Sequence, residues 1–273
     1  MILPVIFSLA LLTPQDPGGP WCTVSAANDH VAPRAVASIE REVEPAIHRL
    51  REVFPDLPRK PFSVVVHRSA DDLPAALRPF HHEGSPGFAM LGRHQIHLML
   101  AEVNDTPSGV RAVLAHEFTH EFLDQACAPF GNLVPRWFHE GLAQVVARDT
   151  YLGASEEAIV WRVASRNLLP FAELAETFPH SLNELRVAYA QSYSYVAWLE
   201  RKLGQPRLIA MARSVGKDRT FDQALVVTTD RSTAELTEAW RDHVLNGSGA
   251  TWRVVLQQFF GISMILALPL LAL

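Results

Sequence analysis

Two histidines, four residues apart, stand in the middle of a strongly apolar segment. Its apolar periodicity predicts a helix from Pro107 to about Ala126, with Thr106 as the N-cap and proline at a first position that needs no N–H donor. The four-residue step places His116 and His120 one turn apart on the same face. Because their neighbours are apolar, this helix is expected to be largely buried, with the histidines opening into a dry site.

Imidazoles at this spacing are typical of a shared metal ion. Glu117 lies directly beside them in the string HEFTH. Catalytic zinc usually takes three protein ligands and keeps a position for water, and two histidines with one glutamate are a known set. Glu140 is the next strong candidate, because a turn-rich loop over 128–134 would fold a second helix back against the first. The sequence therefore predicts a zinc site of His116, His120 and Glu140.

Two strings in this region resemble the gluzincin metallopeptidases, which include the thermolysin and aminopeptidase N groups and the membrane-associated peptidase MA-like domains. HEFTH corresponds to the HExxH helix, and WFHEGLA over 137–143 is similar to the W-[LF]-x-E-G-[FL]-A stretch that supplies the third ligand. The resemblance implies one Zn²⁺ per chain on His116, His120 and Glu140. It also implies that Glu117 is the general base that activates water to hydrolyse a peptide or protein substrate.

A third segment, residues 189–204, is similar to the aminopeptidase N segment that opens with a catalytic tyrosine and ends in a Leu-Gly turn. The alignment places Tyr189 in that position, where its phenol would donate a hydrogen bond to the oxyanion of the tetrahedral intermediate. Tyr193, one helical turn later, is the alternative. Packing of an amphipathic helix would also explain both tyrosines.

The chain departs from these families at two positions. Gln144 stands where thermolysin-like enzymes have an aspartate that orients a ligating histidine. The string GFAML over 87–91 lacks the glutamate with which aminopeptidases hold the free amine of their substrate. Endopeptidase activity is therefore favoured over aminopeptidase activity, and the edge of a strand over Gln95–Leu100 is expected to pair with an extended substrate.

Hydrophobic periodicity predicts an α+β fold, in which a small N-terminal mixed α/β part packs its sheet on the HExxH helix and a mainly helical half follows. In the first part the expected elements are a helix over Val31–Pro55, a strand over Phe62–His67, a short helix over Ala70–Leu77 and a half-buried strand over Gln95–Leu100. In the second part helices are expected over Trp137–Arg148, Glu156–Arg166, Val187–Leu203, Pro206–Val215, Phe221–Val226 and Thr233–Leu245.

Apolar segments stand at both ends of the chain. Residues 2–12 are too few to span a bilayer of ~30 Å and match the core of a signal peptide. Residues 254–273 carry no charge and approach the ~20 residues of a transmembrane helix, although two glutamines also suit a buried terminal helix.

These segments divide the chain into a signal peptide or hydrophobic segment (1–20), a zincin-like metallopeptidase domain (21–245), a linker (246–253) and a transmembrane helix (254–273). The expected protein is exported and anchored in a membrane of the cell envelope, with its catalytic domain on the extracytoplasmic side.

The charge and cysteine content exclude a nucleic-acid-binding protein and a disulfide-rich scaffold. The 24 basic and 29 acidic side chains give a net charge of -5 without a basic run, so nucleic acid is not an expected partner. Cys22 and Cys127 are too few for a disulfide scaffold, and they are either bridged to each other in an exported chain or separately buried thiols.

Other histidines do not follow a ligand pattern and are expected at the surface or satisfied in the core, namely His81, His82, His94, His97 and His139. Of these, His139 is expected to point away from the metal.

Two rival functions stay open. One is a catalytically inactive, membrane-anchored binding or regulatory protein that retains the gluzincin shell. The other is a zinc-free structural domain with a chance HExxH string. The presence of all of His116, Glu117, His120 and Glu140 favours the enzyme, and the second rival requires both strings to coincide by chance.

Overall fold

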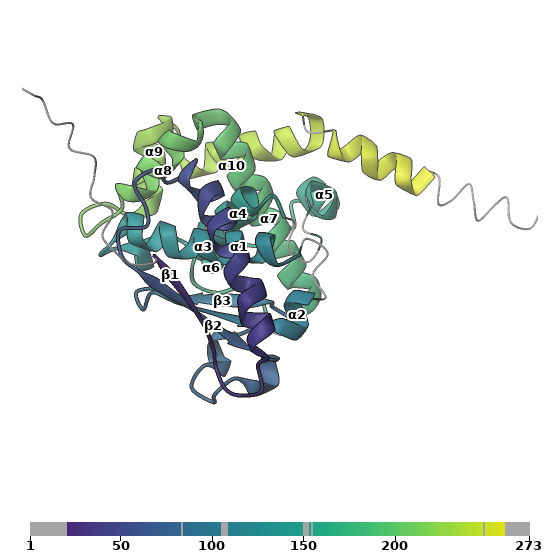
Figure 1. Ribbon diagram of the computed structural model, residues 1–273. Helices are drawn as coiled ribbons and strands as arrows, with labels where there is room; N and C mark the ends of the chain where they lie inside the picture. Colours follow the sequence, from purple (N-terminus) through teal and green to yellow (C-terminus); the bar gives the residue numbers. More distant parts are fainter. Residues whose placement is uncertain are drawn as a thin grey trace, which may run out of the picture.

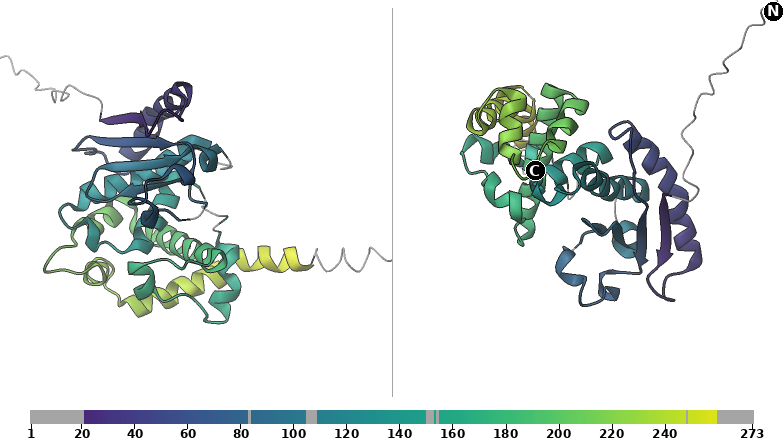
Figure 2. Two further views of the ribbon diagram at one scale, coloured as in Figure 1. Left: turned by 90° about the horizontal axis from the view of Figure 1, so that it is seen from below. Right: turned by 90° about the vertical axis from the view of Figure 1, so that its left-hand side faces the viewer.

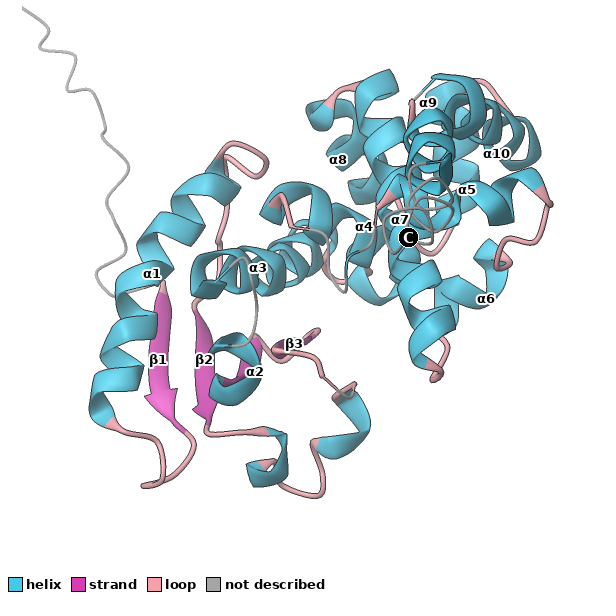
Figure 3. Ribbon diagram, turned by 90° about the vertical axis from the view of Figure 1, so that its right-hand side faces the viewer, coloured by secondary structure: helices cyan, strands magenta, loops and turns pink. Residues whose placement is uncertain are grey.

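The computed structural model of the chain describes residues 21–82, 84–104, 109–149, 153, 155–247 and 249–259. A sheet with helices α1 and α3 forms one part, and helices α4 to α10 form the other (Figures 1 and 3). The expected order of a mixed α/β part followed by a helical half is confirmed.

Four strands form one sheet in the order β1-β2-β4-β3. Their bounds are Cys22–Ala26 for β1, Phe62–His67 for β2, Gly87–Met90 for β3 and Gln95–Met99 for β4. β1 and β4 each run parallel to β2, whereas β3 runs antiparallel to β4 and forms one edge of the sheet. The expectation that the strand over 95–100 offers a free edge is wrong, because β2 and β3 occupy both of its sides.

The two faces of the sheet are covered differently. One face carries Phe62, Val64, Val66, Ile96 and Leu98 and packs on α1 (Pro33–Arg51) and α3 (Gly109–Cys127). The rings of Phe62 and Phe118 meet edge to face, with centroids 5.0 Å apart. The opposite face carries a smaller cluster of Leu73, Phe88, Met90 and Met99. Because both faces are covered, β4 is buried over four of its five residues rather than half-buried.

The expected helix over Ala70–Leu77 is replaced by two 3-10 turns, Ala70–Asp72 and Arg78–Phe80. Leu73 is extended, with a ψ of 129°, because it precedes Pro74 and a residue before proline is driven out of the helical region. The N-cap expected at Thr106 lies outside the described residues.

The helical part is built around α7, which packs along α4 and α5. Two capping boxes fix the starts of α9 and α10, on Thr220 with Gln223 and on Ser232 with Glu235. The bounds are Leu100–Asn104 for α2, Arg136–Ala147 for α4, Glu156–Ala164 for α5, Phe171–Glu176 for α6, Leu182–Leu203 for α7, Gln205–Arg213 for α8, Phe221–Thr229 for α9 and Thr233–Asp242 for α10.

A final helix over residues 250–259 projects from the helical part (Figures 1 and 2). In the part of the chain that the structure describes, no helix is both long and apolar enough to cross a membrane. Most of the transmembrane segment expected at 254–273, and all of the segment at 1–20, lie outside the described residues. Cys22 and Cys127 are both free thiols, and burial raises the pKa of each to about 12, so both stay protonated at neutral pH.

A pair of buried histidines lies on the outer face of the sheet. Nε2 of His67 and Nδ1 of His97 are 3.0 Å apart, and the ring of Phe88 stacks on His97 with centroids 4.9 Å apart. Burial, with a smaller contribution from the neighbouring His67, lowers the pKa of His97 to about 4. The pair is therefore neutral in the folded protein at neutral pH.

The low pKa of His97 predicts that the folded protein loses stability in mild acid. Between its ordinary pKa of 6.5 and its folded pKa of about 4, His97 binds a proton in the unfolded chain but not in the folded one. Its stabilising effect is complete above the ordinary value and declines as the pH falls. We expect a lower free energy of unfolding at pH 5 than at pH 7, and a smaller difference in His97→Gln, by denaturant titration. Exposed His30→Gln is the control, and an unaltered difference in His97→Gln would contradict the prediction.

Candidate metal centre

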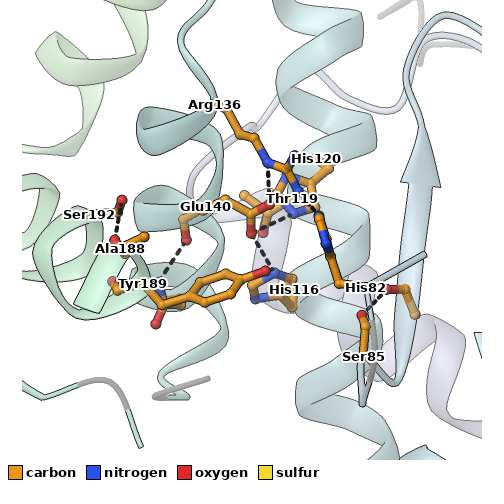
Figure 4. Close-up of polar contacts among 12 residues, drawn as sticks. His82, Ser85, His116, Thr119, His120, Arg136, Glu140, Ala188, Tyr189 and Ser192 are labelled. Atoms are coloured by element: carbon orange, nitrogen blue, oxygen red, sulfur yellow. Dashed lines mark hydrogen bonds and ion pairs between the residues drawn. The ribbon is translucent and has the colours of Figure 1, made fainter. Parts of the chain in front are cut away.

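The site forms where α3, from the sheet part, crosses α4, from the helical part (Figure 4). α3 is buried along nearly its whole length, since the sheet, α1 and α4 all pack against it. His116 and His120 are each 8% exposed, so they are embedded in protein yet reach the surface of a cavity. The expected burial of this helix is therefore observed.

Three residues predicted as ligands converge here. Oε2 of Glu140 lies 3.4 Å from Nε2 of His116 and 3.5 Å from Nε2 of His120. Tetrahedral ligands at ~2.0–2.1 Å from zinc are about 3.3–3.4 Å apart, so the spacing of these donor atoms fits one zinc ion. The carboxylate atom is buried and faces both imidazoles, as suits a ligand atom. The set of two imidazoles and one carboxylate also has the chemistry that zinc requires.

The charges of this cluster are strongly coupled. Burial acts to raise the pKa of Glu140, but the imidazoles of His120 and His116, together with Arg136, lower it well below its usual range. Burial acts to lower the pKa of His116. The carboxylates of Glu140 and Glu117 have the larger effect together and raise this pKa. Attraction between the Glu140 carboxylate and the histidines thus stabilises the cluster.

Glu117 lies beside the cluster and faces the same cavity. Burial raises its pKa, with a smaller contribution from the Glu140 charge, while His116 and His120 oppose the increase. The backbone of β3 approaches it closely, because a Cβ at Gly87 would lie 3.1 Å from Cγ of Glu117. Glycine at position 87 therefore allows the edge strand and the buried carboxylate to share one wall of the cavity.

The cavity has a volume of about 600 Å³ and is bounded by β3, α3, the start of α4 and the segment from Ala175 to His180. Tyr189 reaches it from α7, with its phenol extending toward the histidines (Figure 4). Tyr193, the alternative, is half-buried and is not among the described residues that line the cavity.

His139 does not point away from the metal centre, as the sequence had suggested. Its ring centroid lies 5.8 Å from that of His120, and the residue lines the cavity. The reason is that the cavity extends over the first turn of α4, so positions 139 and 140 both face it. Burial lowers the pKa of His139 to about 3, which keeps this ring neutral.

Arg136 and His82 also belong to this site, although they were not among the functional residues predicted from the sequence. The available signal for Arg136 was helical spacing, since it precedes Glu140 by four residues and hence shares its face. No comparable signal existed for His82, which is 54 residues away from Arg136 along the chain.

The position of Glu140 depends on close packing of α4 against α7. A Cβ at Gly141 would lie 2.4 Å from the carbonyl oxygen of Ser192 and 2.6 Å from Cγ2 of Val196. One turn later, the amide of Gln144 donates to the carbonyl oxygen of Tyr189 at 3.2 Å, and so joins the two helices. Gln144 thereby links α4, which carries Glu140, to α7, which carries Tyr189.

Gly141→Ala should therefore displace α4 and weaken metal binding. Overpacking of this kind typically costs about 1–3 kcal/mol, and the neighbouring Glu140 would move with the helix. Thermal unfolding and zinc titration of the variant test this expectation. Gly216→Ala is the matched control, because the added carbon would meet only Phe130 at an ordinary 3.6 Å. Equal zinc affinity in the two variants would count against the proposed role of the α4–α7 contact.

Comparison with known proteins gives one result. Residues 43–246 match a family model described as the Peptidase MA superfamily. Neither a curated protein nor a solved structure matches the chain. The match spans the second half of α1, the sheet strands β2 to β4 and all of the residues that converge on the metal centre.

Proposed function

Because the chain belongs to the Peptidase MA superfamily, we propose that it hydrolyses peptide bonds with one zinc ion held by His116, His120 and Glu140. The observation that carries this proposal is the convergence of three ligand atoms within 4.8 Å of one another at the wall of a cavity. Zinc in this position would polarise the scissile carbonyl and lower the pKa of water toward ~7. The family resemblance to gluzincins supports the same assignment.

Glu117 is proposed as the general base. It accepts a proton from the attacking water and donates it to the leaving amine, which requires a carboxylate that faces both groups. Its place in the cavity beside the two histidines supports this role. Burial raises the pKa of this carboxylate and so makes it a stronger base.

β3 is the proposed binding edge for the substrate backbone. Its four residues all line the cavity, and its outer side does not pair with another described strand. An extended peptide would add to the sheet there, and its carbonyl would lie next to Glu117 because Gly87 has no side chain.

We propose endopeptidase rather than aminopeptidase activity. We also propose that the protein is exported and anchored through residues 254–273, as the apolar ends of the sequence indicate.

Zinc content and proteolysis of the full chain test the function. The wild type should bind about one zinc ion per chain by elemental analysis, as expected for a catalytic site. Glu140→Ala should lose most of the metal, whereas Glu117→Gln should retain it and lose hydrolysis of a diverse peptide library. A folded wild type without zinc would refute the proposal. A zinc-loaded wild type that cleaves no peptide would instead favour an inactive binding protein.

Tyr189 is proposed to donate a hydrogen bond to the oxyanion. Removal of one such donor costs about 10²–10³ in kcat in a well-studied case, so Tyr189→Phe should lower kcat by about 10² or more while KM and zinc content change little. Tyr193→Phe removes a matched phenol from the same helix outside the cavity. Comparable kcat values in the two variants would assign Tyr189 a packing role.

A further inference from the structure

Arg136 is a cationic side chain in the cavity that the proposed chemistry does not use. Arg136 is the first residue of α4, and its Nε lies 3.7 Å from Oε1 of Glu140. The imidazoles face the other oxygen of the same carboxylate, Oε2. The Arg136 side chain is 29% exposed, so its guanidinium reaches the cavity from beside the ligand without blocking the atom that faces the histidines.

The guanidinium is held from two further directions. Its Nη2 donates to Nε2 of His82 at 2.5 Å, and its central carbon lies 5.1 Å from the ring centre of Phe178. His82 must therefore be neutral at this nitrogen, because arginine supplies the proton. The contact with His82 joins α4 to the segment before β3 (Figure 4), and both residues line the cavity. Ordering of the arginine side chain by the fold reduces the entropy that a ligand would otherwise have to overcome.

The donor geometry of Arg136 suits an anionic ligand. Among the described residues that line the cavity, Arg93 is a second guanidinium, and Glu117, Glu140 and Glu176 are the carboxylates. A guanidinium has five N–H donors in a planar fork that matches a carboxylate, and the contacts to Glu140 and His82 involve two of its nitrogens. The group is thus both fixed and able to bind a further partner through its remaining donors.

We propose that Arg136, positioned by His82 and Phe178, binds a carboxylate of the substrate, so that this site prefers peptides with an acidic group close to the scissile bond. The inference rests on the proposed function and specifies its substrate class. The carboxylate belongs either to an acidic side chain or to the C-terminus of the peptide, and both present the same two oxygens. In this role Arg136 determines substrate specificity and also contacts Glu140.

Binding of peptides to the full chain with Glu117→Gln tests the inference without requiring hydrolysis. Three peptides of otherwise identical sequence are compared by calorimetry: a neutral peptide amide, the same amide with one glutamate, and the neutral peptide with a free C-terminus. One of the two carboxylate peptides should bind about tenfold to a hundredfold more tightly than the neutral amide, as expected for a hydrogen bond to a charged group. Which of them does so identifies the source of the carboxylate.

Arg136→Gln in the same background should abolish this preference, and Arg136→Lys should leave a smaller one because lysine keeps the charge without the fork. Arg93→Gln is the matched control, since it removes another cation that lines the cavity. Zinc content is measured throughout, and Arg136→Lys carries the test if Arg136→Gln no longer holds the metal. A variant that binds all three peptides more weakly by the same factor would show that Arg136 acts only through Glu140 and would overturn the inference.

Two other results would also overturn it, namely equal binding of the three peptides to the parent protein and a preference that persists in Arg136→Gln. The same peptides are offered to the protein with Glu117 intact to measure hydrolysis separately. A carboxylate preference without hydrolysis would support the role of Arg136 and contradict the proposed function. Hydrolysis without a carboxylate preference would support the proposed function and contradict the role of Arg136.

Discussion

The attraction between the Glu140 carboxylate and two histidine side chains constrains how the two parts of this protein fit together. A buried carboxylate is costly unless charged or polar partners surround it, and here the partners belong to a helix that packs on the sheet. α4 therefore has to present Glu140 toward α3 with little freedom in position. Gly141 and Gln144 meet this requirement from the other side, because they hold α4 close to α7.

Local sequence signals were sufficient for the parts of the fold that depend on periodicity. The spacing of His116 and His120 located the central helix, and the β-branched run before His67 located β2. Glu140 could be selected as the third residue because a short turn-rich segment separates it from α3. These features are encoded within a few tens of residues, so their placement does not require knowledge of distant contacts.

Features that arise from long-range pairing could not be predicted in this way. β3 lies among glycine and proline residues that resemble a loop, and it becomes a strand because β4 is available for pairing. The short helix expected over Ala70–Leu77 does not form as one element, because Pro74 keeps Leu73 in an extended conformation. The contact between Arg136 and His82 joins an element of the helical part to a segment before β3, and nothing in either local sequence specifies that distance.

The brevity and placement of β3 have a consequence for solubility. An exposed sheet edge invites pairing with other molecules, and proteins protect such edges by shortening or covering them. β3 has four residues, and all of them line the cavity, as do residues of α3, α4 and α7. So short an edge offers a second folded sheet little length for pairing. The geometry proposed to admit a peptide thus also guards against edge-to-edge aggregation.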